Sequence, residues 1–149
     1  MPKIIRWNTK RKLLDYETKF RRTVSDRFRA LIEEIEPGVH QFEPIRFINK
    51  DGSDLAVRWF WQVCNRLASA DPETTNYDTS RGVWLRPLLE DARLFFDEKK
   101  IGDAKFWHDK HLGGGPFVTN DVKEKIEKAK MSGIHFNGPR KTLGEARNA

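Results

Sequence analysis

The 149-residue chain has the length of one ordinary domain and is long enough to bury a core without disulfides. Its single cysteine, Cys64, excludes an internal disulfide framework, and no Cys/His spacing typical of zinc occurs. The sequence contains neither a secretory signal nor a long apolar run, so we expect a cytoplasmic protein without a membrane span. A net charge of +6 favours a polyanionic partner or an acidic protein surface.

Residues 1–22 form a basic segment in which eight Lys and Arg side chains accompany two acids. Trp7, Tyr16 and Phe20 are interleaved with these charges. We expect an edge strand or a docking arm here. Because basic side chains contact phosphates and aromatic rings stack on bases, the segment also supports a nucleic-acid hypothesis, although no helix-turn-helix or RNA-recognition signature accompanies it.

A helix is predicted after Ser25, whose hydroxyl suits an N-cap, because apolar residues recur on one stripe as far as Ile35. Residues 40–48 and 55–64 then predict a hairpin whose turn, at 49–53, contains Gly52. On the second of these strands alternate residues from Leu55 to Val63 are apolar, and Arg58 and Gln62 belong to the opposite face. The pattern therefore indicates a strand packed on one face and partly covered on the other.

The remainder of the chain predicts short elements. Residues 69–81 indicate a long polar loop, 99–103 a turn, and 82–85, 92–96 and 105–108 short strands. A second helix is expected after Thr119 or Asn120, and residues 138–149 are expected to form a disordered tail. Strands outnumber helices and most connections are too short for crossover helices, so we expect one α+β domain over residues 23–137 with a mostly antiparallel sheet.

Two parts of the chain repeat each other. The phrases Val24-Ser25-Asp26, Ile32-Glu33 and Gly38-Val39-His40 recur 94 to 95 positions later as Val118-Thr119-Asn120, Ile126-Glu127 and Gly133-Ile134-His135. Such self-similarity predicts a duplicated unit of capped helix, glycine exit and short strand. We expect the two repeat-related helices to pack on one face of the sheet.

No catalytic constellation is evident in the residue order. His108, Asp109 and His111 lie close together before a glycine-rich segment, which leaves open solvent exposure, a metal site, or a small hydrolase that uses His108 and Asp109. No further His/Cys cluster completes a metal shell, and no nucleophile, base and acid arrangement follows. We therefore expect no enzymatic activity, no metal and no cofactor.

The repeated phrases resemble a known family. Val24-Ser25-Asp26 through Pro37-Gly38-Val39-His40, and Gly115-Pro116-Phe117-Val118-Thr119 through Gly133-Ile134-His135-Phe136, are similar to the bacterial polymorphic-toxin immunity proteins numbered eleven in the usual classification. The likeness covers about residues 20–137. It implies a protein that binds and neutralises a cognate toxin domain from a neighbouring gene by stoichiometric complex formation, without a catalytic step.

The partner-binding residues are predicted from residue chemistry. Protein interfaces favour aromatic and Arg anchors, so we expect Arg81, Trp107, His108 and His111, near two irregular loops, to contact the toxin. Alanine at these positions is expected to weaken binding while leaving folding intact. The alternative function is a nucleic-acid-associated module that uses the basic N-terminal arm. Toxin identity and oligomeric state do not follow from the sequence.

Overall fold

The computed structural model describes residues 3–19, 21–88, 91–137 and 141–144, which divide into two compact units. The first unit comprises the residues up to Cys64 together with Asn120–His135. The second comprises Asn65–Thr119 and the residues from Phe136 onward. The chain leaves the first unit after Cys64 and returns to it through Asn120–His135.

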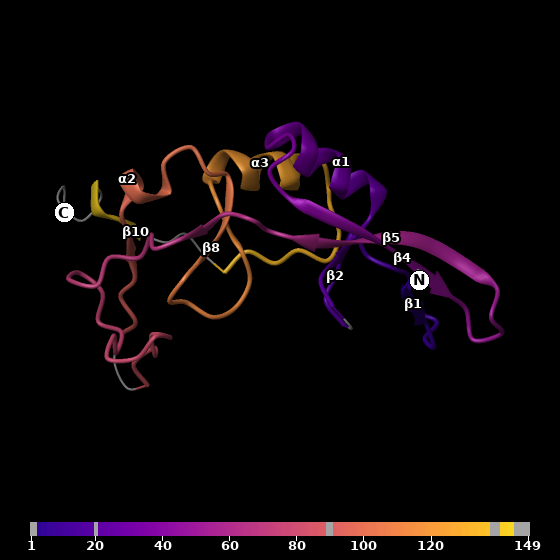
Figure 1. Ribbon diagram of the computed structural model, residues 1–149, viewed down its shortest axis with the longest axis horizontal. Helices are drawn as coiled ribbons and strands as arrows, with labels where there is room; N and C mark the ends of the chain where they lie inside the picture. The colour runs from indigo at the N-terminus through magenta and orange to yellow at the C-terminus, as the bar shows by residue number, and fades with distance from the viewer. Residues whose placement is uncertain (1–2, 20, 89–90, 138–140, 145–149) are drawn as a thin grey trace. The chain divides into compact units, whose positions relative to one another are not determined.

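The first unit is built on a five-stranded sheet (Figure 1). Its strands, in spatial order, are β1 (Lys3–Arg6), β4 (Gln41–Ile48), β5 (Asp54–Gln62), β3 (Thr23–Val24) and β2 (Tyr16–Glu17). Only β1 and β4 pair in parallel, so the predicted mostly antiparallel sheet is confirmed. The turn between β4 and β5 has Gly52 at φ +89°, a conformation that glycine adopts without a steric penalty.

The basic N-terminal segment belongs to this sheet. Strand β1 is one edge and pairs with β4, which confirms the expected edge strand. Trp7 follows it into a buried cluster with Ile45 and Phe47, packed also by Leu13. The apolar side chains between the basic ones thus pack the segment against the sheet. Phe20 lies outside the described residues.

Helix α1 (Asp26–Ile35) begins at Ser25, whose Oγ accepts a hydrogen bond from the Phe28 backbone N–H, as predicted for an N-cap. Phe28 and Ile32 are buried, and the Phe28 ring meets Trp61 of β5 edge to face at 5.8 Å. Helix α3 (Asn120–Lys128) likewise buries Val122 and Ile126. Figure 1 shows both helices on the same side of β4 and β5, in agreement with the predicted α+β arrangement.

The sequence repeat corresponds to a repeated strand and helix, but its two copies end differently. Strand β3 leads into α1, and β9 (Phe117–Val118) leads into α3. Gly38, at φ +69°, then turns the chain into β4 as predicted. Gly133 also has positive φ, +83°, but residues 134–137, all of which the structure describes, form no strand. The Ser132 C=O instead accepts a hydrogen bond from the Tyr16 N–H.

The two faces of β5 are covered in a way that alternation alone does not reveal. Trp61 is buried under α1, but Leu55 and Val57, on the face expected to be packed, are exposed. On the opposite face Arg58 is buried, and its Nη2 donates to the Leu14 C=O at 2.6 Å. The segment before β2 supplies this carbonyl acceptor and that of Asp15, and these bonds allow a cation to be buried on this face.

The second unit contains short strands around an aromatic core. Its elements are β6 (Arg66–Leu67), β7 (Phe95–Phe96), α2 (Glu98–Ile101), β8 (Phe106–Asp109), β9 and β10 (Lys141–Thr142). Strands β6 and β9 flank β8, and β7 pairs with β10. The buried cluster consists of Ala70, Trp84, Leu94 and Phe96. The strand expected at 82–85 is reduced to a bridge between Leu85 and Asp78.

The C-terminal segment contains a short strand. Within the expected disordered tail, Lys141–Thr142 form β10, in parallel register with Phe95–Phe96 of β7. This pairing joins segments far apart in sequence through backbone hydrogen bonds, which a polar composition does not reveal. Residues 138–140 and 145–149 of the expected tail lie outside the described residues.

Candidate partner-binding surface

Trp107 and His108 lie on β8, in the second unit. Trp107 is 4% exposed, donates from Nε1 to Ser69 Oγ at 3.0 Å, and stacks on Phe117. His108 is half-buried, and its backbone N–H donates to the Asn65 C=O. Because the Trp107 ring fills part of the core, alanine there leaves a cavity, and the expectation that this substitution leaves folding intact does not fit its burial.

The segments that carry Arg81 and His111 come together. The His111 ring stacks on Trp84 with a centroid separation of 4.8 Å and an interplanar angle of 7°. Its Nδ1 lies 3.2 Å from the Gly82 C=O, and the Trp84 N–H donates to the His111 C=O at 2.8 Å. Arg81, next to Gly82, is exposed. Two of the four predicted residues therefore belong to one local surface.

The buried Asp109 carboxylate holds the backbone beside this surface in place. It is 3% exposed, and its Oδ2 accepts from the backbone N–H groups of Ser69 and Ala70 and from Ser69 Oγ. Its Oδ1 accepts from the His111 N–H. Both carboxylate oxygens thus hold loop backbone in place. This role is structural, whereas the hydrolase hypothesis gives Asp109 a catalytic role. Among the described residues, no three His, Cys, Asp or Glu side chains gather as a metal site.

The residues that follow Arg81 form a surface feature that the sequence did not predict. We name residues 83–88 the apolar loop. Its Val83, Leu85 and Leu88 are 57%, 48% and 98% exposed, whereas Trp84 between them is buried. The strand expected at 82–85 implies that neighbouring side chains alternate between the core and solvent. The sequence does not show which of them face solvent, because this depends on the packing of Trp84 against His111.

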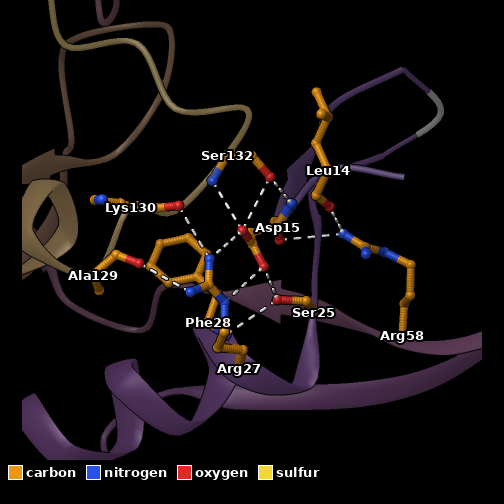
Figure 2. Close-up of polar contacts among 9 residues, drawn as sticks. All are labelled: Leu14, Asp15, Ser25, Arg27, Phe28, Arg58, Ala129, Lys130 and Ser132. Carbon is orange, nitrogen blue, oxygen red and sulfur yellow. Dashed lines mark hydrogen bonds and ion pairs between the residues drawn. The ribbon is translucent and has the colours of Figure 1, made fainter. Parts of the chain in front are cut away.

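A second polar cluster, centred on Asp15, organises the first unit (Figure 2). Asp15 Oδ2 accepts from Arg27 Nη2 at 2.7 Å and from the Ser132 N–H at 2.9 Å, while Oδ1 accepts from Ser25 Oγ at 2.7 Å. Arg27 also donates to the C=O groups of Ala129 and Lys130, which follow α3. Figure 2 shows Arg27 on one side of the Asp15 carboxylate and Ser132 on another. The cluster ties the start of α1 to the end of α3.

The electrostatics of Asp15 follow from these bonds. Partial burial disfavours the carboxylate, but hydrogen bonds from Arg27, Ser132 and Ser25 outweigh it and hold the pKa of Asp15 well below its ordinary value of 3.8. The side chain is 14% exposed. A carboxylate whose oxygens are hydrogen-bonded in this way holds neighbouring chain segments together, so we assign Asp15 a structural role.

The basic N-terminal residues make contacts within the same unit. Lys3 Nζ pairs with Glu43 at 2.8 Å, and Arg11 Nη2 pairs with Glu17 at 2.9 Å. Trp7, proposed for base stacking under the nucleic-acid hypothesis, is buried against Phe47. Some of the basic side chains and the Trp7 ring on which the nucleic-acid hypothesis depends therefore make contacts within the fold itself.

Comparison with protein families shows the family of this chain. The model of the immunity protein family (Imm11) matches residues 3–139, nearly the whole chain, so the protein belongs to this family. The match confirms the resemblance inferred from the repeated phrases and extends it through the basic segment from Lys3. A search of curated proteins finds no match. In the described part of the chain, no helix is long and apolar enough to cross a membrane.

Proposed function

We propose that this protein neutralises a cognate bacterial toxin by forming a stoichiometric complex with it, without a catalytic step of its own. The observation that carries the proposal is membership of the immunity protein family over residues 3–139. The chemistry of the described residues agrees with it. Asp109, the acid of the alternative hydrolase hypothesis, accepts hydrogen bonds from loop backbone on both oxygens.

The toxin domain is proposed to come from a neighbouring gene of a polymorphic toxin system, and binding to take place in the cytoplasm. We retain Arg81 and His111 as proposed contacts because their segments form one surface of the second unit. His108 is half-buried beside Trp107, whose buried ring supports the strand. Their proposed contribution to binding is therefore to position this surface.

Growth rescue tests the proposal. The C-terminal domain encoded by the adjacent large open reading frame is expressed in a permissive host with and without this protein. Rescue together with co-purification of the two chains at a fixed ratio is the expected result. Toxicity that persists while this protein accumulates in folded form would contradict the proposal.

The nucleic-acid hypothesis makes a different prediction. Binding through residues 1–22 would weaken steeply with salt, because contacts to phosphates release counterions. Titration of single-stranded and duplex DNA and RNA at two salt concentrations separates the hypotheses. Tight, salt-sensitive binding that is lost on charge removal at Lys10 and Lys12 would favour a nucleic-acid partner.

A further inference from the structure

The apolar loop presents large hydrophobic side chains to solvent on a fixed backbone. Val83, Leu85 and Leu88 point away from a core to which Trp84 contributes. Three such side chains within six residues are uncommon on a surface without a partner, since each loses favourable burial while it stays in water. Clusters of this kind mark interaction sites.

The backbone of this loop is held on both sides of Trp84. The His111 ring stacks on the Trp84 ring, and the Trp84 N–H donates to the His111 C=O. Leu85 exchanges two backbone hydrogen bonds with Asp78, at 2.9 and 3.0 Å. A partner that binds at Val83 and Leu85 therefore loses little conformational entropy, because the backbone beside these residues is already held in one arrangement.

Two arginines give the surface its charge preference. Arg81 precedes the apolar loop, Arg86 lies inside it, and both are exposed. Within the described part of the chain, neither forms a direct ion pair with a carboxylate, although the charge of Arg81 helps to lower the pKa of the nearby Asp78. Exposed cations without a direct ion pair around an apolar centre are complementary to a partner in which carboxylates surround an apolar depression.

We propose that the apolar loop is the principal anchor for the toxin, and that it inserts Val83, Leu85 and Leu88 into an apolar depression bordered by carboxylates on the toxin domain. This inference rests on the proposed function and adds the surface and its chemistry. The arginines steer association and the apolar side chains slow dissociation.

The first unit supplies a matched control. Ile4 on β1 and Val57 on β5 are each 53% exposed and share one face of the sheet. Arg46 lies between them in the register and forms an ion pair with Asp54. The double variant Ile4→Ser/Val57→Ser removes a similar amount of exposed apolar surface from the sheet of the first unit.

The experiment measures affinity and rates for the purified toxin domain encoded beside this gene. Wild type is compared with Val83→Ser/Leu85→Ser, with Leu88→Ser and with the sheet control, each checked for folding by thermal unfolding. We expect the loop double variant to bind at least about 30-fold more weakly, Leu88→Ser about fivefold more weakly, and the control like wild type. Arg81→Glu/Arg86→Glu should slow association and reduce its salt dependence.

The outcomes separate the two proposals. If wild type neither rescues growth nor binds, the proposed function fails. If wild type binds and both folded loop variants retain affinity within about twofold, the loop is not the anchor while the immunity role stands. Equal losses in the loop and sheet variants would also overturn the assignment, because they would indicate dependence on exposed apolar area in general. Leu88→Ser, which removes a side chain 98% exposed, keeps the test valid if the double variant unfolds.

Discussion

Gly133→Ala should destabilise the protein far more than the same change at Gly38, its counterpart in the repeat. Both glycines have positive φ, +83° and +69° respectively. A Cβ on Gly38 meets nothing within 4 Å, but one on Gly133 would lie 2.1 Å from the Tyr16 carbonyl oxygen and 2.9 Å from Leu14 Cβ. The first substitution adds backbone strain, and the second adds strain and a clash with backbone.

The magnitudes follow from these environments. An L-residue in the left-handed region costs about 1–2 kcal/mol, which is the whole expected loss for Gly38→Ala. At Gly133 the clash also separates the chain from residues 14–16, where Ser132 accepts from the Tyr16 N–H and donates to Asp15. At about 1 kcal/mol for each of these hydrogen bonds, the total loss for Gly133→Ala becomes about 4 kcal/mol.

Urea denaturation followed by tryptophan fluorescence measures this difference, since Trp7, Trp59 and Trp61 lie in the same unit as Gly133. The two variants should differ by about 2–3 kcal/mol in unfolding free energy. Losses equal within about 0.5 kcal/mol would refute the reasoning, because they would mean that the chain near Tyr16 moves aside without cost.

Three further substitutions test the scaffold by urea denaturation. Asp15→Asn should cost about 2 kcal/mol at pH 7. Because the folded-state pKa lies below the ordinary 3.8, this contribution is present above about pH 4 and is lost as pH falls further, so a wild-type advantage unchanged at pH 3 would contradict it. Arg58→Leu should cost about 2–3 kcal/mol by leaving the Leu14 and Asp15 carbonyls unpaired, and an unchanged midpoint would show that water replaces the guanidinium. Trp107→Ala should cost about 3–5 kcal/mol, whereas normal stability with lost toxin binding would make Trp107 a contact residue.

Local elements could be predicted because their causes are local. The Ser25 hydroxyl and the apolar stripe to Ile35 determine where α1 begins and which side is buried, and Gly52 provides the turn between β4 and β5. The repeated phrases indicated two helices that are each followed by a glycine, and the family to which the chain belongs, but the strand expected after the second helix does not form. These features depend on residues a few positions apart.

The toxin contacts stay a prediction, and the structure shows only where the proposed residues lie. Arg81 and His111 were chosen for their residue type, and the structure brings their segments together through Trp84. Trp107 was chosen for the same reason but is buried, because an aromatic residue suits a core as well as an interface. Residue type alone does not separate these two uses.

By itself, the sequence determined the α+β class, the N-cap of α1, the hairpin and the absence of a disulfide framework. The predicted hydroxyl cap of the second helix is wrong for Thr119, whose buried Oγ1 has no hydrogen-bond partner among the described residues. The tertiary structure decided which alternating residues are covered: Val57 is exposed, although it belongs to the face of β5 that was expected to be packed, and Arg58 on the opposite face is buried. It also decided that Gly133 lies against Tyr16 while Gly38 faces open space. Alternation shows which side chains share a face, but the segment that covers that face arrives through long-range backbone pairing, and local sequence carries no signal for it.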